Sequence, residues 1–166
     1  MERADKSKSV LVISDSHGRE RKLEDILFTL GSLSPRERID EVIFLGDGAR
    51  GMTERAEEER VRLLAVLGNC DGSTVIDGSG EMIPEERIET VCGKRIFMIH
   101  GHTYGVKGGL GHTHMPLATY LPSGDESFGF AIPKALYVFN PGALLSGSFG
   151  IFSVSNGNIL LSHGQI

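Results

Sequence analysis

The stretch from His100 to His114, which reads HGHTYGVKGGLGHTH, holds four of the chain's six histidines in two pairs. Imidazole is the commonest metal ligand among protein side chains, and it changes its charge near neutral pH. Alternate residues of an extended His-Thr-His segment point to the same side, so His112 and His114 can both face one site. The types and spacing of these residues therefore favour metal binding.

Other metal-binding side chains stand directly after short apolar runs, in VLVISDSH, VIFLGD, LAVLGNCD and IFMIHGH. In an open α/β sheet, ligands bind outside the carboxyl ends of the strands, so these side chains should meet at one edge. The candidate ligands are Asp15, His17, Asp47, Asn69, His100, His112 and His114.

Each motif also fits an ordinary structural role when it is taken alone. Asp15 could cap a helix, Asp47 could belong to a common turn, and Cys70 could be a small buried thiol. His100 could be a core histidine, and the GHTH motif could lie in a surface loop. The repetition of ligand-type residues after successive apolar runs favours the metal site over these separate explanations.

The mixture of donors constrains the ion. Histidine, aspartate and asparagine without paired thiolates suit manganese, iron, zinc or a similar divalent ion, and the set is too rich in nitrogen to favour calcium or magnesium. Seven ligands exceed what one ion takes, whereas two ions about 4 Å apart that share one carboxylate would use them all. We expect manganese first, with zinc, iron, nickel and cobalt as alternatives.

Alternating elements must position these residues in the first half of the chain. The patterns predict strands over Ser9–Ser14, Glu41–Asp47 and Leu63–Asp71, an amphipathic helix over Arg19–Leu33, and a charged helix over TERAEEERV. Strands that alternate with helices indicate a parallel sheet with crossover helices. The charged helix is expected to present a solvated face.

The second half has an antiparallel character. RIETVCGKRIFMIHGH predicts a hairpin around Gly93 and Lys94, and ALYVFNPGA predicts a strand that runs into a turn. FGIFSVSNGNILLS holds Asn156 and Gly157 between apolar runs, which is a strong hairpin signal.

Composition limits the classes of protein. A length of 166 residues suits one domain over 1–166, and a net charge of −5 without a basic cluster argues against a nucleic-acid-binding surface. No apolar run reaches the length of a membrane span, and the N-terminus lacks a signal-peptide core. Cys70 and Cys92 form neither a zinc-type pair nor a disulfide framework, so the expected compartment is the cytoplasm.

The motifs DSHG, GDG, GNCDG, HGHTYG, GHTH and NPGA occur in the order found in calcineurin-like metallophosphoesterases. The chain resembles most their small bacterial and archaeal phosphodiesterases of the YfcE type, over nearly its whole length. This resemblance implies an α/β fold, a metallophosphatase sandwich of two mixed sheets flanked by helices in four layers. It also implies a dinuclear metal site at the strand ends.

The resemblance also implies a role for each ligand. Asp15, His17 and His114 would hold one metal, Asn69, His100 and His112 would hold the other, and Asp47 would bridge them. The reaction would be hydrolysis of a small phosphodiester or phosphomonoester, by in-line attack of a hydroxide that bridges the two divalent metals.

Asn69, Cys70 and His102 are the residues that the resemblance implies for catalysis. His102 would contact phosphate or support the metal ligands. Cys70 stands where many larger relatives carry a histidine that stabilises the phosphoryl oxygen or protonates the leaving group, although the small phosphodiesterases also carry cysteine. Because a thiol is a weaker donor and acid than imidazolium, we expect modest turnover and a preference for good leaving groups.

The connection between the histidine pairs departs from the family. There, YGVKGGL begins a helix and a buried strand leads into GHTH, whereas here Gly111 and His112 follow Leu110 at once. The link can still reach, since twelve residues span up to about 40 Å, but a helix and a strand would be missing and a sheet edge would be open. The chain could be a shortened variant that rearranges or forms a homo-oligomer, a homologue with a damaged site, or one whose printed sequence omits a segment.

A second functional reading follows from this departure. The chain could be a catalytically weak or inactive scaffold that binds other proteins, as a retromer subunit with the same fold does. A scaffold has little reason to retain seven ligands, so hydrolysis is the favoured reading. A metal-storage protein is disfavoured, because storage requires neither an asparagine ligand nor a shared carboxylate.

Overall fold

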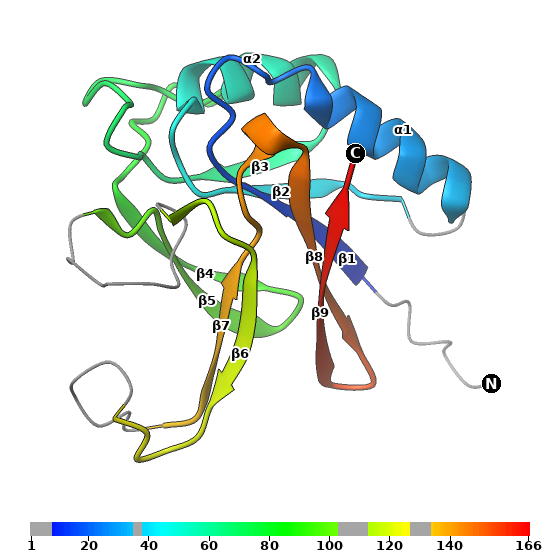
Figure 1. The fold of residues 1–166 in the computed structure, drawn as a ribbon. Helices are drawn as coiled ribbons and strands as arrows, with labels where there is room; N and C mark the ends of the chain where they lie inside the picture. Colours follow the sequence, from blue (N-terminus) through cyan, green and yellow to red (C-terminus); the bar gives the residue numbers. More distant parts are fainter. Residues whose placement is uncertain (1–7, 35–37, 103–112, 127–133) are drawn as a thin grey trace.

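The computed structural model describes residues 8–34, 38–102, 113–126 and 134–166, and its centre is a five-stranded sheet with the strand order β3-β2-β1-β8-β9 (Figure 1). Along the chain, the first elements are β1 (Lys8–Ile13), α1 (Lys22–Leu33), β2 (Glu41–Phe44), α2 (Ala49–Glu58) and β3 (Arg62–Ala65). The later elements are β4 (Glu86–Val91), β5 (Lys94–Ile99), β6 (Leu117–Leu121), β7 (Leu136–Asn140), the 3-10 helix η3 (Leu144–Ser146), β8 (Ser148–Ser155) and β9 (Asn158–Gln165).

The first half of the chain confirms the predicted alternation of strands and helices. β1, β2 and β3 pair in parallel, and β8 runs antiparallel to β1 on its other side. The elements are shorter than the patterns suggest, since β2 and β3 end at Phe44 and Ala65 and the following residues turn. The second helix begins earlier than predicted, at Ala49, and ends before Arg60, whose φ of 57° cannot continue a right-handed helix.

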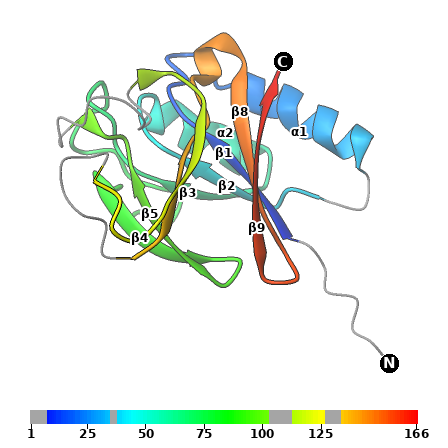
Figure 2. The ribbon, with the colours of Figure 1, turned by 60° about the horizontal axis from the view of Figure 1, so that its bottom comes forward.

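The parallel strands β1, β2 and β3 are buried over most of their length on both faces, which explains why they are apolar runs, whereas the edge strand β9 alternates between half-buried and exposed residues. Leu11, Phe44 and their neighbours pack against Leu23 and Ile26 of α1 and Met52 of α2. On the opposite face, a second cluster includes Val10, Val12, Ile43, Val66, Val91, Met98 and Phe152. Figure 2 shows the two helices on one side of the sheet and the β4–β5 hairpin on the other. The result is a layered structure in which the sheet is the middle layer.

The hairpins of the second half confirm its antiparallel character. The β8–β9 turn is formed by Asn156 and Gly157, which both have positive φ (51° and 78°), as a type I′ turn requires. The β4–β5 turn falls on Cys92 and Gly93, one residue earlier than predicted. β6 was not predicted, because its short sequence, LATYL, carries little strand signal outside its pairing with β7.

The short connection between the histidine pairs lies mostly in residues 103–112, which are outside the described part of the chain. The described residues between β5 and β6 contain neither an α-helix nor a strand. Within the described chain, β4–β5 and β6–β7 form two separate two-stranded sheets, so each of these strands pairs on one side only. The open edges agree with the expected lack of a strand between the two hairpins.

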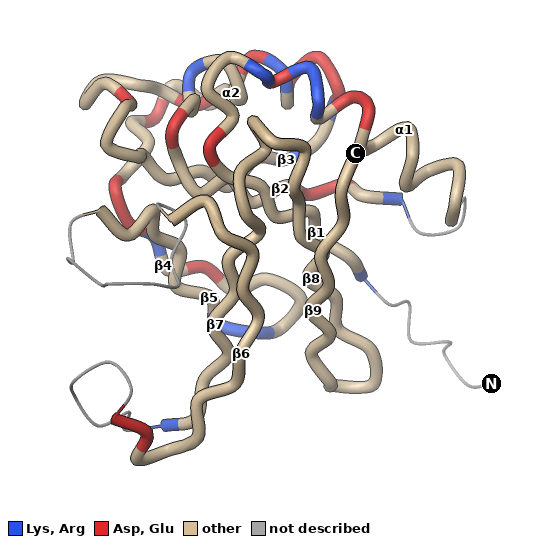
Figure 3. The backbone as a smooth tube through the Cα atoms, viewed as in Figure 1, with Lys and Arg blue, Asp and Glu red and all other residues tan. Residues whose placement is uncertain are grey.

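Charged side chains are distributed over the surface in a mixed pattern. Figure 3 shows acidic and basic residues interleaved along α2, where Arg55 forms ion pairs with Glu58 and Glu59 of the same helix and with Glu24 of α1. This arrangement supports the reading of the charged helix as a solvated face. A search of the described helices finds none with the length and apolar character that crossing a membrane requires.

The turns after β2 and β3 touch backbone to backbone, and this contact depends on Gly46. A Cβ at Gly46 would lie 2.5 Å from the backbone nitrogen of Gly68, and Gly46 has a φ of 100°. We expect Gly46→Ala to lower the free energy of unfolding by about 2 kcal/mol or more, measured by chemical denaturation.

Gly31→Ala is the matched control, because a Cβ there meets nothing within 4 Å and the site lies in α1. That substitution should leave stability unchanged or raise it by up to about 1 kcal/mol. Equal stability of the two variants would contradict the close packing of the turns.

Candidate metal centre

Loops at one end of the central sheet and of β5 bring the candidate ligands together. Asp15 and His17 follow β1, Asp47 follows β2, Asn69 follows β3, His100 follows β5 directly, and His114 precedes β6. Asp15, Asp47 and His100 are buried, whereas the side chains of His17 and His114 retain 29% and 44% of their exposure. One side of the site is therefore buried in the core, and the side that carries His17 and His114 is open to solvent.

The backbone at the site adopts conformations that most residues avoid. Left-handed φ values occur at Asp15 (55°), His17 (43°), Asp47 (63°) and His114 (57°). Such conformations cost up to about 1 to 3 kcal/mol for a residue other than glycine, and they are concentrated at functional sites. The fold thus maintains an unfavourable backbone at four of the candidate ligands.

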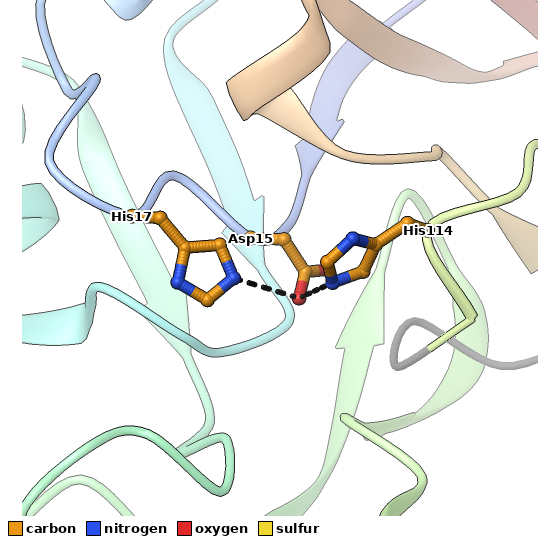
Figure 4. A group of neighbouring side chains, drawn as sticks. All are labelled: Asp15, His17 and His114. Atoms are coloured by element: carbon orange, nitrogen blue, oxygen red, sulfur yellow. Dashed lines mark ion pairs between the residues drawn. The ribbon is translucent and has the colours of Figure 1, made fainter.

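Asp15, His17 and His114 form one cluster of donor atoms (Figure 4). The Nε2 atom of His114 lies 2.9 Å from Oδ1 of Asp15, and Nε2 of His17 lies 3.7 Å from the same oxygen. The two rings approach Asp15 from different loops, with their centroids 5.7 Å apart. These are the three residues that the family resemblance implies for one metal.

His100, Asn69 and Asp47 form a second convergence of donors. The Nε2 atom of His100 lies 3.1 Å from Oδ1 of Asn69 and 3.5 Å from Oδ2 of Asp47. The Nδ1 atom of His100 is 2.8 Å from the carbonyl oxygen of Leu45, which can only accept a hydrogen bond. In the tautomer in which Nδ1 donates to this carbonyl, Nε2 is available as a ligand, and an outer hydrogen bond of this kind commonly orients a histidine in metal sites.

The two oxygens of Asp47 have different surroundings. Oδ1 accepts a hydrogen bond of 2.8 Å from the backbone N–H of Cys70. Oδ2 faces both clusters, at 3.5 Å from Nε2 of His100 and 3.7 Å from Nε2 of His17. Oδ2 of Asp47 therefore lies within ion-pair distance of one imidazole from each group of ligands.

The buried state of Asp15 fits a bound cation. Its Oδ1 atom is buried without a hydrogen bond, and Nε2 of His114 lies 2.9 Å from it. Two ligand atoms bound to one metal ion would lie similarly close to each other. Burial raises the pKa of Asp15, and this effect outweighs the opposing hydrogen bond from Ser14 and the charges of His100 and His114. Divalent ions that accept nitrogen and oxygen donors suit this set of residues.

The other residues implied for catalysis lie beside these clusters. Cys70 is exposed, and Nδ2 of Asn69 lies 3.4 Å from its sulfur. A hydrogen bond to Asp47 raises the pKa of the Cys70 thiol, with smaller contributions from burial and nearby acidic groups, so the thiol is protonated at neutral pH. The ring of His102 lies 5.4 Å from that of His100, and its buried Nδ1 has no hydrogen-bond partner in the described part of the chain.

One implied ligand, His112, lies outside the described residues. Its neighbour Thr113 is positioned by Asn140, a residue to which the motifs assigned no function. The Nδ2 atom of Asn140 donates to Oγ1 of Thr113 over 3.2 Å, and Oδ1 of Asn140 accepts from the N–H of Gly142. The ring of His163 lies 2.7 Å from the carbonyl oxygen of Asn140. The NPGA motif therefore supports Thr113 of the GHTH motif, and the presence of NPGA in the sequence was the only available signal.

This combination of sheet, strand-end ligands and ordered motifs defines a class of protein. Residues 9–157 match the calcineurin-like phosphoesterase superfamily domain, and the chain belongs to this superfamily. Its members are metal-dependent phosphoesterases, so the family agrees with the clusters of metal-binding side chains. A search of curated proteins gives no match.

Solved structures share the fold at low sequence identity. A predicted phosphoesterase from Streptococcus pneumoniae superimposes with a TM-score of 0.64 at 18% identity, covering 98% of this chain and 91% of that one. A Thermotoga maritima protein gives 0.60 at 24% identity, with coverage of 96% and 99%. Vacuolar Protein Sorting 29 from Cryptosporidium parvum gives 0.57 at 15% identity, with the same coverage.

The raised pKa of Asp15 predicts a pH dependence of the metal-free protein. Above the ordinary carboxyl pKa, the folded state holds this proton more tightly than the unfolded state, so stability falls as pH rises through that interval. Chelator-treated Asp15→Asn should lack this fall and should unfold at a higher temperature than the wild type at neutral pH. Added Mn(II) should stabilise the wild type more than the variant.

Asp40→Asn is the control, because that carboxylate is exposed and pairs only with Arg38 in the described chain. It should change stability by less than about 0.5 kcal/mol at any pH. Melting temperatures between about pH 4 and pH 7 measure the effect. A wild type that follows the same curve as Asp15→Asn would contradict the burial of a charged Asp15.

Proposed function

We propose that the protein is a phosphodiesterase that hydrolyses small phosphodiesters with two divalent metals, most favourably manganese. One observation carries this proposal: Oδ2 of Asp47 contacts both His17 (3.7 Å) and His100 (3.5 Å), which belong to different ligand clusters. A single ion would leave one of the clusters without a role. The membership of the superfamily supports the broader statement that the protein is a metal-dependent phosphoesterase.

Each residue has a defined task in this proposal. Asp15, His17 and His114 hold one ion, Asn69, His100 and His112 hold the other, and Asp47 is shared. When bound, the two ions supply a hydroxide nucleophile for in-line attack at phosphorus and neutralise the charge that develops on the phosphate oxygens.

The protein residues around the ions bind and orient the substrate. Asn69 and Cys70 lie on the loop after β3, and Cys70 is exposed where a phosphate group would approach. His102, whose ring lies 5.4 Å from that of His100, would contact the phosphate or support the metal ligands. A protonated thiol is a weak acid, so departure of the product depends on a leaving group that is stable as an anion.

A scaffold function is the second candidate. It is supported by the shared fold of Vacuolar Protein Sorting 29 from Cryptosporidium parvum and by the exposed thiol in place of an imidazole. The edges of the two hairpins that are unpaired among the described strands would suit contacts with another chain, including a second copy of this one. We further propose a cytoplasmic location, which the two free cysteines, Cys70 and Cys92, support.

Hydrolysis of bis(p-nitrophenyl) phosphate tests the function directly. Chelator-treated protein should be inactive, and added Mn(II) should restore turnover as elemental analysis approaches two ions per chain. Asp47→Asn should lower metal content and turnover together, by at least about a hundredfold in turnover, because the shared negative charge is lost.

The control for this experiment is Asp40→Asn, which removes an exposed carboxylate outside the clusters and should keep full activity. A fully active Asp47→Asn variant would contradict the two-metal proposal. Folded wild-type protein without metal and without turnover would favour the scaffold.

Cys70→His tests the role of the thiol. An imidazole at this exposed position can donate a proton to poor leaving groups, so hydrolysis of phenyl phosphate, whose leaving group is poorer than p-nitrophenolate, should rise by about tenfold while metal content stays the same. Cys70→Ser, which also removes the thiol but adds no acid, should show no such gain. Identical rates in the wild type and Cys70→His would mean that residue 70 does not face the substrate.

A further inference from the structure

Asp71 is not a candidate metal ligand, yet its carboxylate makes the densest set of hydrogen bonds near the site. Its Oδ2 accepts from the backbone N–H groups of Asp47 (2.8 Å) and Gly68 (2.9 Å). Its Oδ1 accepts from those of Gly48 (2.8 Å) and Ala49 (2.9 Å). Four backbone donors therefore converge on one partly buried side chain.

These donors belong to two different loops. Gly68 lies in the loop after β3, which also carries Asn69, whereas the other three donors run from the end of the β2 loop into the first residue of α2. Asp71 thus ties the loop that carries Asp47 to the loop that carries Asn69. The N–H groups at the start of α2 have no partner within the helix, and a carboxylate is the acceptor that best satisfies them.

A reciprocal hydrogen bond completes this connection. The N–H of Cys70 donates to Oδ1 of Asp47 over 2.8 Å, while the N–H of Asp47 donates to Asp71. A Cβ at Gly68 would collide with the Asp47 carboxylate, so no side chain separates the two loops. Their spacing is therefore set by these hydrogen bonds and by backbone contact.

We propose that Asp71 is a positioning residue that fixes Asp47 and Asn69 relative to each other, and this role rests on the proposed metal centre. Asp47 is the shared ligand and Asn69 belongs to one of the two clusters. A small shift of either loop would therefore change the spacing of ligands around an ion. Outer residues that orient ligands typically contribute 10- to 100-fold in metal affinity.

The negative charge and acceptor-only character of the carboxylate are what the arrangement requires. An asparagine at this position would be isosteric, but its NH2 group would face two of the four backbone N–H donors instead of accepting from them. The substitution Asp71→Asn therefore removes half of the connection without changing the volume of the side chain. We expect the loops to move apart where the donors are no longer satisfied.

Asp77→Asn offers a matched control in the same chain. Asp77 also accepts backbone N–H groups through one oxygen, from Ser79 at 2.9 Å and Glu81 at 3.0 Å. It lies in an exposed turn that contacts none of the candidate ligands in the described chain. The two variants make the same chemical change, one beside the site and one away from it.

The experiment is isothermal titration of chelator-treated protein with Mn(II), below the melting temperature of every variant. We expect affinity to fall by about 10- to 100-fold in Asp71→Asn and by less than about twofold in Asp77→Asn. Hydrogen exchange of the metal-free proteins should be faster at the amides of residues 47–49 and 68 in Asp71→Asn alone. A role limited to stability would lower the melting temperature and leave Mn(II) affinity unchanged.

The outcomes separate this role from the proposed function. Tight binding by the wild type with equally tight binding by folded Asp71→Asn overturns the positioning role alone, whereas no binding by the wild type overturns the metal centre and this role with it. If Asp71→Asn does not fold, Asp71→Glu replaces it, because it keeps the charge at α2 and displaces the carboxylate by one methylene. Unchanged affinity in that variant also overturns the role.

Discussion

The burial of two carboxylates at one end of the sheet is the constraint on which the rest of the structure depends. Asp15 and Asp47 retain 0% and 2% of their exposure, and within the described chain all of their ion-pair partners are histidines. A buried charge costs several kcal/mol unless it is compensated. These carboxylates and imidazoles are the side chains that could together hold a metal ion, whose positive charge would compensate the buried carboxylates.

The strands and loops meet this constraint by close contact of backbones. Parallel strands deliver their ends to one edge, and glycines at positions 46 and 68 let the loops touch. The polar groups exposed by these tight loops are then satisfied by side chains that follow the ligands, such as Asp71, rather than by regular secondary structure. The ligands are consequently held by loops with little freedom to adjust.

The local sequence could predict those elements and residues whose role follows from the types of their side chains. The apolar runs of β1 to β3 and the Asp, Asn and His after them show both the parallel sheet and its candidate ligands. Other features depend on partners distant in sequence. β6 becomes a strand by pairing with β7, and His163 acts through the backbone carbonyl of Asn140, an acceptor that any residue could provide. Such contacts leave no pattern in the local sequence.

The attachment of His114 has a consequence for how the site and the fold influence each other. This residue precedes β6, and the β6–β7 hairpin pairs with no third strand in the described chain. A lone hairpin is marginally stable, so its docking opens at a lower free energy than the central sheet unfolds. In the proposed metal centre, ion binding by His114 and docking of the hairpin would form a thermodynamic cycle in which each strengthens the other by the same amount. Metal binding at the proposed site would then favour the docked hairpin, and docking of the hairpin would in turn raise the affinity for metal.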